Sequence, residues 1–412
     1  MTQALRKPAR KNPVARTRQP TRPPTARSRR AQGLTAAAAL GRFDLQVCQQ
    51  CNAVQYPPRE LCTQCLSDDL RWQAVDPLGT LLVSTTLHHS NDLFFRERLP
   101  WRIGTVRMSA GPSVLAHVHG DCNDGDTVRL SLRLDRSGQA VMLALPKEAT
   151  PNMQDDKILR ETHCDPKFRR VLVTDGKSAI GLAVIRALLE AEVGAVFAGD
   201  AETWRKVPAF DALCGDDRVH VQDLNVSDSD SVERISRSIG GKVDIVVNTA
   251  GYERDGGVLF SRDTNKARDA MDINCLGLLR LAQHFGPGMA ARAADGVNNA
   301  VAWVNVLSIY AHMNLPSRGV WSASQAAALS VAQCLRNEFL QSGVRVINVF
   351  PGPVDHEWEQ LTPPPRVAPA AIAAAIVRAL QEGTEDVYVG DVAKEFLARL
   401  RDNPKGLERE LL

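Results

Sequence analysis

The sequence lacks any long apolar stretch. Its 412 residues contain no run of 18 or more uncharged apolar residues, and the N-terminus has no apolar segment of the kind that forms a secretory signal. These absences predict no membrane span and favour a cytoplasmic protein. With 44% hydrophobic residues, the chain can bury more than one core, because single cores stop growing at about 250 to 300 residues. We therefore expect two or three domains.

Acidic residues are missing from the first 30 positions, which hold ten Lys or Arg. The net charge of +3 thus conceals a mildly acidic remainder, with 40 basic and 47 acidic residues. The segment mixes Pro, Thr and Arg without apolar periodicity, so it cannot bury enough surface to offset the entropy of ordering. We predict a disordered basic tail over residues 1–40. It could contact nucleic acid, a membrane surface or an acidic partner, be merely solvated, or precede the true start site.

The cysteines do not form the pattern of a small disulfide scaffold. Five are scattered singly and are expected to be reduced: Cys122, Cys164, Cys214, Cys275 and Cys334. The other four form two Cys-x-x-Cys pairs separated by ten residues: Cys48, Cys51, Cys62 and Cys65. This spacing places four thiolates around one tetrahedral ion, so it predicts a closed, structural zinc site. Iron in a rubredoxin-like site is the alternative metal.

Three compositional regimes follow the tail. A short, turn-rich segment with the four cysteines predicts a zinc ribbon over 41–70, and period-two alternation then predicts a small antiparallel β-barrel over 71–150. Residues 151–169 have little periodicity and are interpreted as a linker. From residue 170 to 412, short β-branched runs alternate with amphipathic stretches. That alternation predicts an α/β fold of the Rossmann type, with a doubly wound parallel sheet.

The ribbon and barrel together resemble an OB-fold family found beside acyl-CoA enzymes, whose members bind thiolases and thiolase-like aldolases. The resemblance includes the segments DPLGTLLVSTTLHHS, WRIGTVRM and GDCNDGDTVRLSL. It implies an accessory module that completes a thiolase partner or helps hold an acyl-CoA. OB-folds and zinc ribbons also bind nucleic acid. Residues 41–150, however, hold 11 basic and 12 acidic residues, so they lack the basic groove that this alternative needs.

The C-terminal part resembles the short-chain dehydrogenase/reductase family over residues 168–412. The motifs VLVTDGKSAIG at 171–181, NTAG at 248–251, DINCLG around Asn274, a Ser at 308 and PGPV at 351–354 occur in the family's order. The resemblance implies a dinucleotide site, and it places cofactor contacts at Gly176, Ile180, Gly181, Asp200, Asp223, Leu224, Asn248, Ala250 and Gly251.

The glycine turn departs from the family pattern Thr-Gly-x-x-x-Gly-x-Gly. Asp175 and Ala179 replace its first two glycines, and only Gly181 remains. A side chain obstructs a turn built for glycine, and Asp175 brings negative charge toward a pyrophosphate. Asp200, which ends the second strand, keeps the position that accepts the ribose hydroxyls of NAD, unless it is only a solvated turn residue. Binding of NAD(H) therefore stays open.

The family's catalytic pair is also missing. A Tyr and a Lys four residues apart normally pass the proton, but the stretch WSASQAA has Trp321 and Gln325 at these positions, with Trp321 thirteen residues after Ser308. An indole N–H is no usable acid near neutral pH, and Gln carries no charge. We therefore name no catalytic residue and interpret four positions as vestigial: Asn274, Ser308, Trp321 and Gln325. Tyr310, the one substitute donor nearby, is expected to be a packing residue.

Together the two resemblances imply a non-catalytic accessory or scaffold subunit of an acyl-CoA-processing complex. By the first resemblance, the ribbon and barrel would dock a thiolase or thiolase-like subunit. Short-chain dehydrogenases pair through long helices that flank the active site, so the second resemblance implies that helices at about 265–291 and 322–342 pair with an active short-chain dehydrogenase paralogue or with a second copy of this chain. The alternatives are an active NAD(P)-dependent 3-hydroxyacyl-CoA oxidoreductase with a non-standard proton donor, and a nucleic-acid-binding OB protein.

Overall fold

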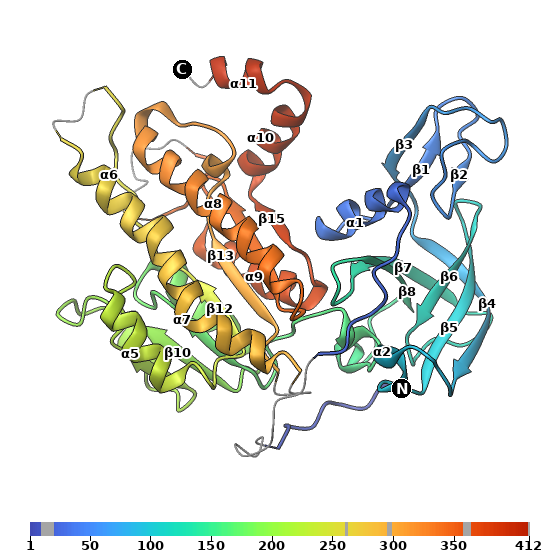
Figure 1. Ribbon diagram of the computed structural model, residues 1–412, viewed down its shortest axis with the longest axis horizontal. Helices are drawn as coiled ribbons and strands as arrows, with labels where there is room; N and C mark the ends of the chain where they lie inside the picture. The colour runs from blue at the N-terminus through green and yellow to red at the C-terminus, as the bar shows by residue number, and fades with distance from the viewer. Residues whose placement is uncertain (10–19, 260–262, 295–298, 357–363, 411–412) are drawn as a thin grey trace. The chain divides into compact units, whose positions relative to one another are not determined.

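The computed structural model describes residues 1–9, 20–259, 263–294, 299–356 and 364–410 (Figure 1). The chain divides into two compact units. The first consists of Met1–Lys7, Pro20–Asp165 and Gln381–Glu385, and the second of Pro8–Gln19, Pro166–Leu380 and Asp386–Leu412. Within the described ranges, no helix has both the length and the apolarity needed to cross a membrane.

The first unit begins its regular β structure with a three-stranded antiparallel ribbon. β1 (Asp44–Cys48) lies between β2 (Val54–Gln55) and β3 (Leu70–Ala74). β1 ends on Cys48, so the strand itself places the first thiol. Leu45, on the same strand, is fully buried in the core that fills the barrel described next. The ribbon and the barrel therefore share one hydrophobic cluster.

A closed five-stranded barrel follows, as the alternating sequence predicts. Its strands are β4 (Leu78–Leu87), β5 (Trp101–Met108), β6 (Ser113–Val118), β7 (Thr127–Leu134) and β8 (Ala140–Pro146), in the closed order β4-β5-β6-β8-β7. A short helix α2 (Leu93–Arg96) joins β4 to β5. Neighbouring strands are antiparallel except β6 and β8, which pair in parallel. The predicted antiparallel barrel is wrong at this one pair, because successive strands alternate in direction and β6 and β8 are two strands apart.

The predicted disordered tail is wrong for its last residues. A 3-10 turn η1 (Arg29–Ala31) leads into helix α1 (Gln32–Ala39), and α1 buries Leu34, Ala37 and Ala38 in the barrel core. These three positions follow the spacing of one helix face, so tertiary burial offsets the cost of ordering them. Residues 10–19 of the predicted tail lie outside the described residues.

The predicted linker also packs into the first unit. It contains two 3-10 turns, η2 (Met153–Asp155) and η3 (Leu159–Glu161). Ile158 and Leu159 are buried against Trp101 of β5 and against Leu143 and Leu145 of β8. This stretch lacks periodicity because two short turns, rather than a helix or strand, carry its apolar residues.

The second unit is a seven-stranded parallel sheet, which confirms the predicted Rossmann-type fold. Its strands are β9 (Arg170–Val173), β10 (Ala195–Gly199), β11 (Val219–Gln222), β12 (Ile245–Asn248), β13 (Ala302–Val306), β14 (Arg345–Pro351) and β15 (Asp386–Val389). The order is β11-β10-β9-β12-β13-β14-β15. The direction of winding reverses between β9 and β12, which is where open α/β sheets bind ligands.

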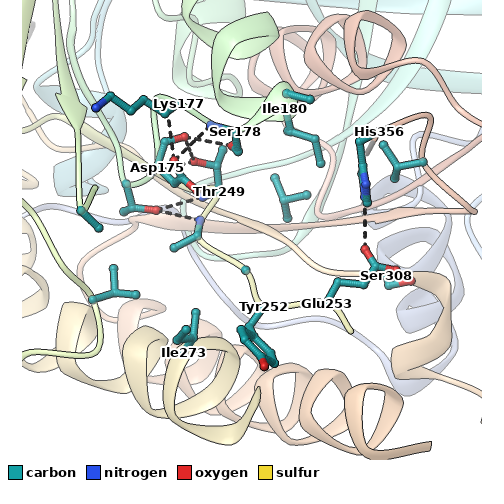
Figure 2. A pocket seen from close by; sticks show the side chains of 18 of the residues that line it. Asp175, Lys177, Ser178, Ile180, Thr249, Tyr252, Glu253, Ile273, Ser308 and His356 are labelled. Atoms are coloured by element: carbon teal, nitrogen blue, oxygen red, sulfur yellow. Dashed lines mark hydrogen bonds and ion pairs between the residues drawn. The ribbon is translucent and has the colours of Figure 1, made fainter. Parts of the chain in front are cut away.

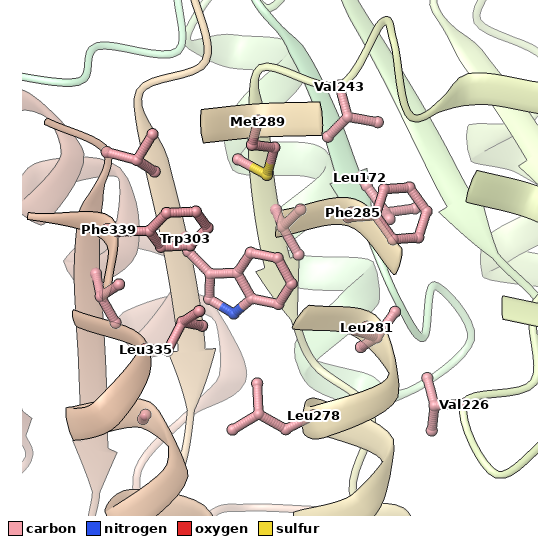
Figure 3. Close-up of a cluster of buried hydrophobic side chains, with 14 of the residues drawn as sticks. Leu172, Val226, Val243, Leu278, Leu281, Phe285, Met289, Trp303, Leu335 and Phe339 are labelled. Carbon is pink, nitrogen blue, oxygen red and sulfur yellow. The ribbon is translucent and has the colours of Figure 1, made fainter. Parts of the chain in front are cut away.

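Helices cover the sheet and surround its largest core. α5 (Ser229–Ile239), α7 (Gly277–Arg292) and α8 (Gly319–Phe339) enclose the buried indole of Trp303 together with Leu278, Phe285 and Phe339 (Figure 3). α3 (Ala179–Glu190) packs on β9 and β10. The remaining helices and turns are α4 (Pro208–Leu213), α6 (Asn265–Ala270), the π-helical turn η4 (Met271–Leu276), η6 (Ile309–Ala311), η7 (Pro316–Arg318), α9 (Pro369–Glu382), α10 (Asp391–Asp402) and α11 (Pro404–Glu410).

Candidate functional site

The four paired cysteines lie together at one end of the ribbon. Their Sγ atoms are all within 4.8 Å of one another. The two pairs adopt the same turn, because Asn52 and Leu66 directly follow the second cysteine of each pair and both have a left-handed backbone, with φ of 59° and 63°. Their backbone N–H groups return to the carbonyls of Cys48 and Cys62, at 2.9 and 3.1 Å. The sequence therefore folds into two matching knuckles.

The knuckles favour the thiolate at the first cysteine of each pair. The backbone N–H of Cys51 lowers the pKa of the Cys48 thiol to about 6, and that of Cys65 likewise lowers the pKa of Cys62. Burial and hydrogen bonds with the other cysteines raise the pKa of Cys51 to about 12 and also raise that of Cys65. Four sulfur donors at this spacing fit the tetrahedral preference of zinc and leave no position for water. The arrangement therefore suits a structural zinc ion.

A second candidate site is a cavity of about 530 Å³ at the carboxyl edge of the parallel sheet (Figure 2). Several predicted residues line it: Ile180, Asp200, Leu224, Ala250, Gly251, Ser308, Trp321 and Gln325. Others are outside its lining: Gly176, Gly181, Asp223, Asn248 and Asn274. The structure thus brings eight of the predicted cofactor and vestigial positions to one cavity.

The turn between β9 and α3 is closed on itself by Asp175. One carboxylate oxygen, Oδ1, accepts hydrogen bonds from the backbone N–H groups of Lys177 and Ser178, both at 3.1 Å (Figure 2). Thr249 fixes the Asp175 backbone, since its hydroxyl accepts from the Asp175 N–H at 3.0 Å and donates to the Asp175 carbonyl at 2.9 Å. Burial raises the pKa of Asp175 to about 6.

The remaining glycine of the turn has a packing reason. A Cβ added at Gly181 would clash with the carbonyl oxygen of Asp175, so only glycine lets α3 approach the turn this closely. Ser178 starts the helix, because its hydroxyl accepts from the Gly181 N–H at 3.0 Å. The helix start is therefore intact although two family glycines are replaced.

Asp200 is held by Lys177. Their charged groups are 2.8 Å apart and both side chains are buried. Lys177 also donates to the backbone carbonyls of Glu202 and Arg205, at 2.8 and 2.7 Å. The alternative of a solvated turn residue at Asp200 is therefore wrong. Asp223, in contrast, is exposed, with Arg234 3.5 Å away.

The positions of the missing catalytic pair are filled by packed side chains. Trp321 and Gln325 lie on α8, each only 7% exposed. The Trp321 ring lies 5.7 Å from that of Tyr310, and both belong to one buried cluster. The Ser308 hydroxyl caps η6 by accepting from the Tyr310 N–H at 3.3 Å. Among the described residues, the buried Oε1 of Gln325 has no hydrogen-bond partner.

The side chains of Asn274 and Asn248 hydrogen-bond to neighbouring segments of the second unit. Asn274 accepts from the Tyr252 N–H at 2.7 Å and donates to the Tyr252 carbonyl at 3.0 Å and to Ser324 at 2.8 Å. Asn248 accepts from the Thr174 hydroxyl at 2.8 Å. Both side chains thus join neighbouring elements of the fold beside the cavity.

An ion cluster at the cavity was missed by the sequence reasoning. Arg318, 4% exposed, donates to Glu253 at 2.5 Å and to Asp255 at 2.6 Å. His356 lies 3.1 Å from the other Glu253 oxygen (Figure 2). The four residues come from three loops far apart in the chain. No motif or spacing connects them, so the sequence offered no signal for the cluster.

Sequence models of three families match the chain. The short chain dehydrogenase model matches residues 169–364. The ChsH2 rubredoxin-like zinc ribbon model matches residues 35–71, and the ChsH2 C-terminal OB-fold model matches residues 72–133. Their order along the chain is that of the ribbon, the barrel and the parallel sheet.

Individual relatives agree with the short chain dehydrogenase match. A farnesol dehydrogenase from Aedes aegypti is 28% identical over 45% of this chain and 77% of its own length. Ketoacyl reductase HetN from Nostoc sp. is 24% identical over 58% of this chain and 87% of its own. A short chain dehydrogenase from Burkholderia cenocepacia, crystallised with NADP, is 32% identical with a TM-score of 0.54, over 60% of this chain and 99% of its own.

Proposed function

We propose that this chain, whose C-terminal domain belongs to the short-chain dehydrogenase family and whose N-terminal domains are a ChsH2-type zinc ribbon and OB-fold, is a non-catalytic accessory subunit of an acyl-CoA-processing complex. The observation that carries the proposal is the pair of buried side chains, Trp321 and Gln325, at the positions where the family places its proton-transferring Tyr and Lys.

Oxidation of an alcohol by hydride transfer needs a group that accepts the hydroxyl proton. A phenol near a lysine can do this, because the cation lowers the phenol's pKa. An indole and a carboxamide cannot, since neither changes its charge near neutral pH. Lys177, the lysine that lines the cavity, forms an ion pair with Asp200 at 2.8 Å. Its charge is therefore not directed at a phenol. The Trp321 and Gln325 positions therefore support binding rather than proton transfer.

The outer face of the barrel supports docking of a thiolase or thiolase-like subunit. Val83, Thr105 and Leu115 form one cross-strand row on β4, β5 and β6, so their side chains share a face. Val83 is 55% exposed and Leu115 60% exposed, and Leu82 beside them is also exposed. Apolar side chains in adjacent outward positions suit a protein contact better than solvent.

A different surface supports pairing with an active dehydrogenase or with a second copy of this chain. The run of α6, η4 and α7 exposes Met271, Leu276 and Leu279. These residues lie on helices that frame the second unit, within the predicted pairing segment at about 265–291. Pairing with an active dehydrogenase would place an intact cavity beside the altered one.

The two surfaces provide matched controls for each other. The chain is purified with candidate thiolase and dehydrogenase subunits from its native host. Val83→Asp with Leu115→Asp should remove the thiolase and keep the dehydrogenase, because a charge on an apolar contact is costly to desolvate. Leu276→Glu with Leu279→Glu should do the reverse. Retention of both partners by both double variants would contradict these docking assignments.

One observation favours a second candidate, an active oxidoreductase. Tyr310 lines the same cavity as Ser308, and its ring lies 5.7 Å from that of Trp321. If the Tyr310 phenolate accepted the hydroxyl proton as hydride passed to NAD, the purified chain would oxidise a 3-hydroxyacyl-CoA, and Tyr310→Phe would abolish that turnover.

A further inference from the structure

The start of α3 is a place where anions bind, and in this chain an internal anion already occupies it. Backbone N–H groups at a helix N-terminus carry the positive end of the helix dipole. Here the N–H groups of Lys177 and Ser178 both point at the Asp175 carboxylate, at 3.1 Å. A phosphate would have to displace a carboxylate that is tethered to the same turn, and so has a high effective concentration there.

The cations nearest to this turn are also paired. Lys177 lies 2.8 Å from Asp200, and Arg205 lies 3.3 Å from Glu202. Asp175, Asp200 and Glu202 line the cavity together with these two cations, so this end of the cavity carries no excess positive charge from them. A ligand with a diphosphate would bring two further negative charges toward three carboxylates.

The same cavity also holds a buried hydrogen-bond acceptor. Gln325 lines it and is only 7% exposed, and its Oε1 has no partner among the described residues. A buried acceptor of this kind is normally satisfied by a donor. Ile180, Leu224 and Ile273 give the same cavity apolar walls that suit a flat ring.

We infer that Asp175 closes this cavity to nucleotide phosphates, and that the cavity takes instead an uncharged, hydroxyl-bearing ligand of the nucleoside class that donates a hydrogen bond to Gln325. Asp175 is thus a specificity-determining residue, and its carboxylate substitutes for the anion that the turn would otherwise hold. The inference goes beyond the accessory role and does not depend on any partner subunit.

The test is calorimetric titration of the full chain with three probes: adenosine, ADP and NADH. The wild type should bind adenosine more tightly than ADP or NADH. Asp175→Gly should tighten ADP and NADH by about tenfold, as expected for one charge-assisted contact, while adenosine changes little. Asp175→Asn, which keeps the side chain but not its charge, should give a smaller gain and serves if the glycine variant does not fold. Gln325→Leu should weaken adenosine by about tenfold.

Asp228→Gly is the matched control. Asp228 also accepts from backbone N–H at a helix start, that of α5, but it does not line the cavity. This variant should leave all three affinities unchanged. Wild-type binding of NADH as tight as that of adenosine, or nucleotide affinities that do not respond to either Asp175 variant, would overturn the role of Asp175. Absence of adenosine binding, or binding that survives Gln325→Leu, would overturn the assigned ligand class.

Discussion

Trp321 and Gln325 remove the proton-transferring side chains from the cavity wall, and Trp321 keeps that wall packed. The indole packs on Tyr310 in a buried cluster with Ile309 and Leu407, so its role is accounted for by apolar contact. Replacing a buried aromatic ring by a methyl group leaves a void, whereas a ring-for-ring change keeps most of the packing. The position is therefore sensitive to size rather than to acidity.

Trp321→Ala should lower the free energy of unfolding by about 3 to 5 kcal/mol, while Trp321→Phe should cost less than about 1.5 kcal/mol. Urea denaturation of both variants measures the difference. In a purified complex with a dehydrogenase, Trp321→Phe should leave turnover unchanged, because the indole transfers no proton. A folded Trp321→Phe variant that abolishes turnover would contradict the packing role.

The carboxyl of Asp175 predicts a pH dependence. Burial raises its pKa to about 6, against about 3.9 for an Asp in an unfolded chain. Between these values the folded state binds the additional proton, so this group's contribution to stability increases as the pH falls from 7 through 6. Glu202 and Arg205 supply the charges that act on it, and the Lys177 and Ser178 backbone N–H groups oppose the rise.

The measurement is the urea midpoint of wild type and Asp175→Asn at pH 7.5 and pH 5. Other carboxylates contribute equally to both proteins, so the difference between the two isolates Asp175. The advantage of Asp175→Asn over wild type should be larger at pH 7.5 and should shrink at pH 5. An advantage that does not vary with pH would show that Asp175 titrates near its ordinary value.

Elements with regular patterns could be predicted from the sequence, and elements defined by tertiary contact could not. Alternation along 72–145 predicted the barrel, and the β-branched runs from residue 171 predicted the parallel sheet. Helix α1 was missed because its three buried residues follow a basic, proline-rich segment that dominates the local composition. The Arg318 ion cluster was missed because only the fold brings its loops together.

At Gly33 in helix α1, helix propensity and steric contact predict opposite effects of a substitution by alanine. A Cβ added at Gly33 would clash with the Trp72 ring on β3. Alanine favours a helix over glycine by about 1 kcal/mol, yet Gly33→Ala should destabilise the first unit because the indole must move. Gly288→Ala in α7 is the control: its nearest neighbour would be the Gly240 carbonyl oxygen at 3.9 Å, so it should be neutral or stabilising. Equal thermal shifts for the two variants would exclude the predicted clash.

Zinc removal should act on the first unit alone. The metal stabilises by about 4 kcal/mol when free zinc exceeds its Kd a thousandfold, so chelation should lower that unit's Tm by roughly 10 °C. The effect should reach the barrel, because Leu45 of the ribbon belongs to its core. Cys51→Ser should reproduce it, and Cys334→Ser, at an exposed single cysteine, should not. Calorimetry with metal analysis measures both, and a Tm indifferent to chelation would contradict a structural zinc.

At the scale of the whole molecule, two units with separate cores carry two different features. The first holds a metal knuckle and an exposed apolar row, and the second holds a family cavity whose proton-transfer pair is replaced. Under the proposed function, neither feature alone performs a reaction. Together they favour a subunit that positions other enzymes, which is why partner-dependent activity is the property to measure.

The most direct measurement is NADH formation by the purified chain, given NAD and a panel of 3-hydroxyacyl-CoA substrates, first alone and then with a dehydrogenase subunit recovered from the native host. We predict that the chain alone forms no NADH and that NADH forms once the dehydrogenase subunit is added. NADH formed by the chain alone would contradict it, because a proton acceptor other than Trp321 or Gln325 would then operate in the cavity.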